Sequence, residues 1–362
     1  MAITFSSLTE LQHHGFDTLI DVRSPAEYAE DHVPGAINLP ALSNAQRAEV
    51  GTIYKQVSPF AARKLGAAMV ARNVADHVDG PLAGKDGSWR PLVYCWRGGQ
   101  RSGSVSTILS QIGWRSETIA GGYQSYRRLV QDYLYNAALP HPIILLDGYT
   151  GTAKTAILAR LAARGVQTID LEGLANHRGS LLGAMEGGQP AQRGFETALA
   201  TAMLALDPTA PVVLEAESSK IGKLVIPPAL WYPMRTAPRI VVSAPLEARA
   251  AYLTRSYADM VTDTHALASR LSMLRRLRGY AMVDGWLELL RQHAFKDLAE
   301  SLMREHYDPA YARSRKLDER TIIGEVTAPS LTDDALDRAS DAVARIVIST
   351  PSAAWDRPEP DR

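Results

Sequence analysis

The sequence predicts an α/β protein made of two domains, and three observations support this. Short apolar runs of strand length alternate with stretches whose apolar residues repeat at helical spacing, which is typical of parallel sheets. In each half of the chain a glycine-containing loop follows such an apolar run. The chain has 362 residues, 46% of them hydrophobic, which is enough to bury two cores. We expect a first domain at residues 1–135, a second at 140–325 with a helical portion, and a C-terminal extension at 326–362.

Composition narrows the possible functions. Lys and Arg together number 39, as do Asp and Glu, so a nucleic-acid site would have to be a local patch. The single cysteine excludes an intrachain disulfide and a CxxC metal pair. The N-terminal residues lack a basic region followed by an apolar core, and no apolar run approaches the roughly 18 residues of a spanning helix. We expect a cytoplasmic location and no membrane partner.

In the first domain, buried strands are predicted at residues 17–23 and 91–95. Residues 78–91 have the glycine and proline content of a surface loop. After the second strand, helical spacing is shown by Val105, Ile108, Leu109 and Ile112. A further helix is predicted at 123–139, and the domain junction is expected at 136–141.

In the second domain, strands are predicted at residues 143–148, 166–171, 211–217 and 239–244, with helices between them and hence a mostly parallel sheet. Residues 246–311 have a helical pattern. Within it, one core-facing stripe is predicted from Leu287, Leu290, Ala294, Leu298 and Leu302. The polar and proline-rich residues 349–362 are expected to be disordered.

The only cysteine lies in "LVYCWRGGQRSGS", residues 92–104. Gly98 and Gly99 allow the backbone N–H groups to curl inward around an anion, with a helix N-terminus behind them near Ser102. Positive charge nearby lowers the pKa of a thiol and favours the nucleophilic thiolate. We therefore predict catalytic roles for Cys95, Arg97 and Arg101, and an anion nest made by Gly98, Gly99, Arg101 and Ser102. Two chemistries fit, transfer of a sulfur-type atom and phosphate-monoester hydrolysis; the Cys95-x5-Arg101 spacing alone fits the second.

Two further segments favour the transferase. "DVRSPAEYAEDHVPGAINLP" (residues 21–40) and "IAGGYQSYR" (119–127), together with the cysteine loop, resemble the rhodanese family. The resemblance implies a rhodanese-like fold in which Cys95 carries a chalcogen. Asp31 stands where glycine is commoner. We interpret Asp21, Glu27 and His32 as hydrogen-bond partners that stabilise the fold.

A second anion site is predicted in "LLDGYTGTAKTAIL", residues 145–158, which follows a strand and opens a helix. This is the setting of a P-loop, whose backbone N–H groups and lysine bind phosphate. The expected diphosphate-binding residues are Gly148, Gly151, Thr152, Lys154 and Thr155. Ala153 replaces the glycine that usually precedes the lysine, which favours anion binding over nucleotide turnover. No definite metal site is predicted; Mg²⁺ would lie near Thr155.

Polar residues at the carboxyl ends of neighbouring strands are expected at the same edge of the sheet as this loop. They are Glu215, Glu217, Ser218, Ser219, Lys220, His177 and Arg178.

A rhodanese-like domain followed by a P-loop domain, with "IDLEGLANHRGS" (residues 169–180), "QPAQRGFE" (189–196) and "EAESSKIG" (215–222), resembles the tRNA 2-selenouridine synthase family. The resemblance implies replacement of sulfur by selenium at wobble 2-thiouridine in tRNA, with selenophosphate as donor. It also implies an S-geranyl intermediate made from geranyl diphosphate at the P-loop. It implies no tightly bound cofactor, and an enzyme that supplies selenophosphate as a further partner. With no second cysteine, selenium would pass from Cys95 directly to tRNA or to an external thiol.

The most basic segment, residues 269–279, is the predicted tRNA-binding region. Its arginines are Arg270, Arg275, Arg276 and Arg278. Tyr280 or Trp286 is expected to stack on a base.

Two alternatives remain open at this point. One is an ATP-dependent sulfurtransferase or kinase that acts on a small metabolite, and the other is a phosphatase-like or inactive rhodanese module used for protein binding. Neither accounts for the later segments of the second domain.

Overall fold

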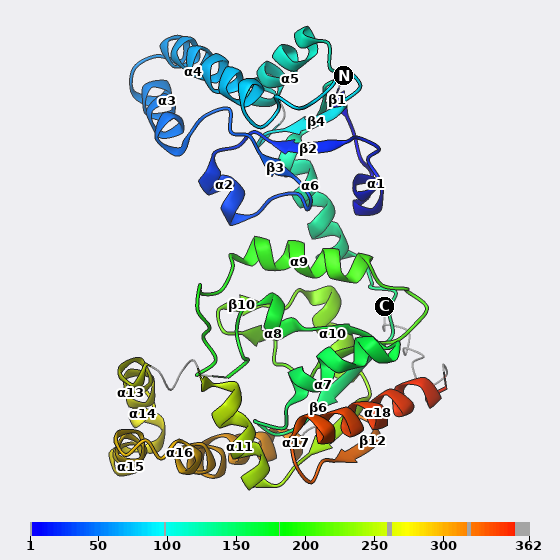
Figure 1. Cartoon of the computed structure of the whole chain (residues 1–362), viewed down its shortest axis with the longest axis vertical. Helices are drawn as coiled ribbons and strands as arrows, with labels where there is room; N and C mark the ends of the chain where they lie inside the picture. Colours follow the sequence, from blue (N-terminus) through cyan, green and yellow to red (C-terminus); the bar gives the residue numbers. More distant parts are fainter. Residues whose placement is uncertain (1, 98, 181, 259–262, 317–319, 352–362) are drawn as a thin grey trace. The chain divides into compact units, whose positions relative to one another are not determined.

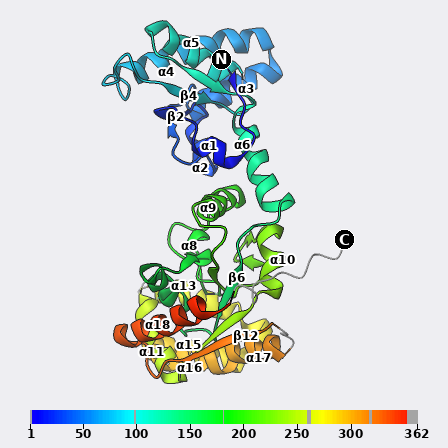
Figure 2. The same cartoon turned by 90° about the vertical axis from the view of Figure 1, so that its right-hand side faces the viewer.

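A computed structural model of the chain describes residues 2–97, 99–180, 182–258, 263–316 and 320–351, with side chains described only outside 314–316. The chain divides into two compact units. Unit 1 is Met1–Ala138 with Pro190–Leu204, and unit 2 is Leu139–Gln189 with Ala205–Arg362. Each unit has its own five-stranded sheet (Figure 1 and Figure 2), and the strand pairs in both sheets are parallel. The predicted α/β class is confirmed.

The sheet of unit 1 has the strand order β1-β5-β4-β2-β3. Its strands are β1 (Ala2–Ile3), β2 (Thr18–Asp21), β3 (Ile37–Asn38), β4 (Pro91–Tyr94) and β5 (Glu117–Ile119). Its helices are α1 (Leu8–Gln12), α2 (Pro25–Glu30), α3 (Asn44–Gln56), α4 (Pro59–Asp79), α5 (Gln100–Ile112), α6 (Gly122–Gln131), the π-helical η1 (Asp132–Asn136) and α9 (Gln192–Leu204). Helices α4 and α5 pack on the sheet through one buried cluster that includes Val70, Val93, Val105 and Leu109. That cluster places the end of β4 and the start of α5 together, where the cysteine loop lies.

The sheet of unit 2 has the order β12-β11-β6-β8-β7. Its strands are β6 (Ile143–Asp147), β7 (Gln167–Ile169), β8 (Val212–Glu215), β11 (Arg239–Ser243) and β12 (Ile322–Thr327), and a separate hairpin pairs β9 (Lys220–Ile221) with β10 (Leu224–Val225). The helices are α7 (Lys154–Leu161), the 3₁₀ turn η2 (Ala162–Arg164), α8 (Leu171–Leu174), α10 (Pro228–Thr236), α11 (Leu246–Ser256), α13 (Thr264–Ser272), α14 (Arg275–Arg278), α15 (Tyr280–Arg291), α16 (Phe295–Leu302), the π-helical η3 (Met303–Tyr307), α17 (Asp308–Lys316) and α18 (Asp333–Ser349). All strands predicted for this domain are present.

The structure differs from the expected domain division in two places. Residues 190–204 belong to unit 1 although the chain on either side of them belongs to unit 2. Residues 326–351 do not form an extension: β12 pairs with β11, and Val343 and Val347 of α18 join the core over the sheet of unit 2. Each segment contains a helix with an apolar face, and burying that face against the rest of a unit is favourable, so each segment packs against a core.

The predicted helical stripe is also divided. Leu287 and Leu290 are in α15, while Leu298 and Leu302 are in α16, and His293 between them has a positive φ of 55°. The leucines nevertheless pack in or against one apolar cluster. Of the tail expected to be disordered, residues 352–362 lie outside the described part of the chain. Within the described residues, no helix is both long and apolar enough to cross a membrane.

Candidate functional site

Cys95 follows β4 directly and lies under the first turn of α5. The Ser102 hydroxyl donates a hydrogen bond to its Sγ at 3.3 Å. Burial opposes ionisation of the thiol, but the Ser102 hydroxyl, the backbone N–H groups of Ser102 and Gly99, and the charge of Arg101 outweigh it and lower the pKa of Cys95. Ser102 and Gly99 therefore stabilise the ionised form of the Cys95 thiol, and their binding of an external anion stays a prediction; Gly98 lies outside the described residues.

The two arginines of the loop are held differently. Arg101 donates to Glu27 Oε2 at 3.0 Å and is partly buried. Arg97 is exposed and donates to Gln124 at 3.2 Å. Glu27 also pairs with Arg47 at 2.9 Å, and although burial opposes it, the pull of Arg101 and Arg47 keeps the pKa of Glu27 low. Glu27 thus positions Arg101 where its charge favours ionisation of the Cys95 thiol, while Arg97 is exposed and contacts Gln124.

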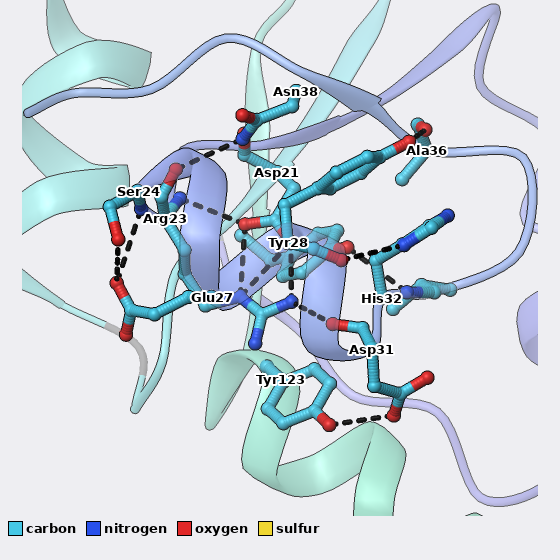
Figure 3. A network of polar contacts seen from close by, with 12 residues as sticks. Asp21, Arg23, Ser24, Glu27, Tyr28, Asp31, His32, Ala36, Asn38 and Tyr123 are labelled. Carbon is cyan, nitrogen blue, oxygen red and sulfur yellow. Dashed lines mark hydrogen bonds and ion pairs between the residues drawn. The ribbon is translucent and has the colours of Figure 1, made fainter. Parts of the chain in front are cut away.

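A buried polar network supports the segment that carries Glu27 (Figure 3). Arg23, 1% exposed, makes a bidentate contact with Asp21, donates to the Asp31 carbonyl and lies over the Tyr123 ring at 3.8 Å. The His32 ring stacks on Tyr28 with the centroids 3.8 Å apart. Asp21, Glu27 and His32 therefore contact other protein groups in the way that fold-stabilising residues do.

The phosphate loop of unit 2 joins β6 to α7, as the sequence predicts. A Cβ on Gly148 would lie 2.5 Å from Thr152 Oγ1 and 2.7 Å from the Val242 carbonyl oxygen, so only glycine fits. Gly151 has a φ of 81° and close contact with Leu253. Lys154 Nζ donates to the Gly148 carbonyl at 3.0 Å, which folds the lysine over the loop.

Ala153, at the N-cap of α7, has φ 60° and ψ 33°, the left-handed conformation that glycine adopts at lower cost. Ala153 therefore has the left-handed backbone conformation that suits a glycine, the residue that usually precedes the lysine in such loops. Its side chain is buried in the core of unit 2. The turn of the loop is kept despite the substitution.

Carboxylates surround the lysine of this loop. Thr155 Oγ1 donates to Glu172 Oε2 at 3.1 Å. Burial and then the charge of Glu172 raise the pKa of Glu217 to about 8, because the two carboxyl groups share a hydrogen bond in which Glu217 keeps its proton. Burial and then the charges of Asp170 and Glu172 raise the pKa of Glu215 to about 8. Burial disfavours charge on Lys154 too, but Tyr311 and the carboxylates outweigh it and raise the pKa of Lys154.

A cavity of about 490 Å³ opens over the phosphate loop. Its lining includes the predicted residues Gly151, Thr152, Lys154, Thr155, His177, Arg178 and Glu217. Glu215 is fully buried beside this group, and Ser218, Ser219 and Lys220 turn into the β9–β10 hairpin and do not line the cavity. Burial lowers the pKa of His177, which favours its neutral form.

Sequence reasoning missed several residues of this cavity. Asp170 and Glu172 follow β7, and the carboxyl-end rule for parallel strands would have found them. Tyr257, Tyr307 and Tyr311 come from the helical portion, and no local signal marks them. Arg178 lies over the ring of Tyr257 at 4.4 Å. No group of three His, Cys, Asp or Glu side chains in the described part of the chain has the geometry to hold a metal ion.

The predicted tRNA-binding arginines mostly have partners in the fold. Arg270 donates to the Leu182 carbonyl at 3.3 Å, Arg275 pairs with Asp284 at 2.6 Å, and Arg278 donates to His306 at 2.9 Å. Arg276 is exposed, and exposed Met273, Leu277 and Tyr280 lie close to it along the chain. Trp286 is 1% exposed, so the expectation that it stacks on a base is wrong, and Tyr280 is the aromatic residue able to do so.

Comparison with known proteins adds two family matches. Residues 4–129 match the model of the rhodanese-like domain, and residues 141–278 match that of the tRNA 2-selenouridine synthase AAA domain. Proteins called tRNA 2-selenouridine synthase are similar over most of their length. Those from Hahella chejuensis and Verminephrobacter eiseniae are 33% and 34% identical, and the alignments cover 81% and 86% of this chain and 84% and 93% of the respective relative.

Proposed function

The chain belongs to the tRNA 2-selenouridine synthase family, and from this we propose that it converts wobble 2-thiouridine of tRNA into 2-selenouridine with selenophosphate, through an S-geranyl intermediate made from geranyl diphosphate. One observation carries the proposal. Each unit has an anion-binding loop with a different reactive group, a thiolate-favouring cysteine in unit 1 and a lysine among protonatable carboxyls in unit 2.

The unit 2 cavity suits the alkylation step. The 2-thio sulfur attacks C1 of geranyl diphosphate, the C1–O bond breaks, and diphosphate leaves with the electron pair. The loop N–H groups and Lys154 stabilise the charge that develops on the diphosphate. S-alkylation also removes the N3 proton of the base. Glu172, which accepts the hydrogen bond from Glu217, is the proposed proton acceptor, because it lines the cavity next to the phosphate loop.

The unit 1 loop suits the selenium step. The N–H groups of Gly99 and Ser102, with Arg101 and the exposed Arg97, form a site for the phosphate-bearing donor. Cys95 is the proposed nucleophile that attacks the phosphorus of selenophosphate: an S–P bond forms, the P–Se bond breaks, selenide leaves with the electron pair, and water later releases phosphate from the cysteine. The selenide then bonds to C2 of the base while the C2–S bond breaks, and geranylthiolate leaves with the electron pair. Alkylation is needed first because a thioether sulfur leaves more readily than a thiocarbonyl sulfur.

Mg²⁺ fits beside the phosphate loop as part of this proposal. Neither carboxylate oxygen of the buried Glu215 has a hydrogen-bond donor at regular distance and angle. The Thr155 hydroxyl is close enough to Glu215 to lower the pKa of its carboxyl group, although burial outweighs this effect. These two residues would hold the ion, which would displace the proton that burial otherwise keeps on Glu215, and the ion would neutralise charge on the leaving group. For tRNA, exposed Arg276 and Tyr280 supply the phosphate contact and the stacking surface.

The test is to incubate the purified protein with tRNA that carries 2-thiouridine, geranyl diphosphate and selenophosphate, omitting each donor in turn, and to weigh the nucleosides after digestion. We expect S-geranyl-2-thiouridine when selenophosphate is omitted and 2-selenouridine when both donors are present. An unchanged nucleoside in every mixture would overturn the proposal. A control with ATP in place of geranyl diphosphate tests the ATP-dependent alternative.

A further inference from the structure

A second cavity, of about 90 Å³, lies next to the cavity over the phosphate loop. The two share five lining residues: Thr150, Ser180, Leu253, Tyr257 and Tyr307. Because these residues contribute to both walls, the cavities are neighbours with a common boundary in unit 2. A ligand anchored by its phosphate groups in the first therefore has a short path into the second.

The lining of the second cavity is almost entirely hydrocarbon. No Lys, Arg, His, Asp or Glu is among the described residues that line it. Its walls come from α11, α13, α16 and η3, and Leu182, Leu267, Leu298 and Leu302 are at most 7% exposed. An apolar pocket next to a cationic phosphate loop matches an amphiphile with a charged head and a hydrocarbon tail.

We propose that this cavity binds the hydrocarbon tail of the allylic diphosphate and that its walls select the length of the tail. The inference rests on the proposed function and deepens it. The diphosphate lies against Lys154 and Thr155, the reacting carbon lies near the boundary formed by Tyr257 and Tyr307, and the remaining isoprene carbons lie between α11 and α16. Each carbon buried there adds affinity that inorganic diphosphate does not gain.

Ala299 of α16 gives the sharpest test, because it lines the second cavity and not the first. Ala299→Phe places a ring where the tail would lie. By isothermal titration of the full chain, we expect the Kd of geranyl diphosphate to rise at least about tenfold and that of inorganic diphosphate to change by less than about twofold. Lys296→Phe adds the same ring to an exposed position of the same helix and should change neither value. An unchanged affinity for geranyl diphosphate in Ala299→Phe, or an equal loss for both ligands, would overturn the tail site.

Phe295→Ala tests the reverse change and does not depend on the folding of the first variant. Phe295 is half-buried in the wall of the cavity, so its removal makes the cavity larger. We expect the affinity for farnesyl diphosphate relative to geranyl diphosphate to rise at least about fivefold; no change in the ratio would count against length selection by this wall.

In the unaltered protein, geranyl diphosphate should bind at least about tenfold more tightly than dimethylallyl diphosphate. If inorganic diphosphate bound and no allylic diphosphate did, the proposed geranyl step itself would be wrong. If all the allylic diphosphates bound equally tightly, the geranyl step would stand and only the proposed tail site would be wrong.

Discussion

Ala153 has a backbone conformation that an L-residue with a side chain adopts at a cost. With φ at 60° its Cβ is crowded by the backbone, and the cost is about 1–2 kcal/mol. The loop around it is tightly packed, since a Cβ added at Gly148 or Gly151 would come within 3.0 Å of a neighbouring atom. Local strain of this kind is common at ligand-binding loops.

We expect Ala153→Gly to raise the free energy of unfolding by about 1 kcal/mol, because glycine adopts this φ without the Cβ penalty. Chemical denaturation would measure it. The matched control is Ala156→Gly, three residues into α7, which should lower the free energy of unfolding by about 1 kcal/mol. If both variants were destabilised alike, the loop would not be strained at Ala153.

Glu215 makes the stability of unit 2 depend on pH. Its pKa is about 8 in the folded chain against an ordinary 4.5, so between these values the folded state holds a proton that the unfolded state has lost. Stability should therefore fall as pH rises through this window, by a few kcal/mol at most. Chemical denaturation at about pH 5 and about pH 9 would measure this decrease in the free energy of unfolding, and we expect a smaller decrease in Glu215→Gln than in the unaltered protein. Glu186→Gln, at an exposed position, should retain the full dependence; an equally steep fall in Glu215→Gln would contradict the assignment.

At the scale of elements, periodicity predicted strands well where both faces are buried. The strands around 143–148 and 211–217 have continuous apolar runs, and each is buried along its length. β12 was not predicted, because it is an edge strand in which only Val326 is buried and the other residues are exposed or partly buried. The break between α15 and α16 was missed because leucine spacing continues across it while His293 turns the backbone.

The membership of α9 in unit 1 depends on contacts far apart in the sequence. Glu196 of α9 pairs with Arg127 of α6, both at most 9% exposed, and accepts a hydrogen bond from Tyr135 at 2.7 Å. The Tyr126 hydroxyl donates to Thr197 at 2.9 Å. No local pattern marks such a pair, because its members are 69 residues apart.

Glu196→Ala should remove one of the two buried carboxylates that pair with Arg127, the other being Asp31 at 3.4 Å, and lower the stability of unit 1 by at most about 3–5 kcal/mol. Hydrogen exchange of peptides from residues 192–204 would show the loss as faster exchange. Arg193→Ala, also on α9, removes an ion pair with Glu30 of α2 whose members are 47% and 53% exposed, and should cost less than about 1 kcal/mol. Equal protection in both variants would mean that α9 is held by its apolar contacts alone.

At the scale of the whole molecule, the two loops were the most predictable part of the site. Glycines, a lysine and a cysteine directly after buried strands carry their own local signal, and the structure places Cys95 and Lys154 as the sequence indicated. The tyrosines and the apolar cavity of unit 2 were not predictable, because α11, α16 and η3 bring together residues that look like ordinary helix-core positions. The loops therefore carry a local sequence signal, whereas the helices that line the two cavities carry none.

Since the reactive groups reside in separate units, the two steps should be separable by mutation. Cys95→Ala should abolish 2-selenouridine and leave S-geranyl-2-thiouridine formation largely intact, because the cavity of unit 2, the proposed alkylation site, contains no cysteine. Lys154→Ala should impair geranylation first, because it removes the cation that neutralises the departing diphosphate. With tRNA that already carries S-geranyl-2-thiouridine, Lys154→Ala should still form 2-selenouridine. The measurement is the mass of the digested nucleosides, and equal loss of both products in each variant would contradict the division of the reaction between the two units.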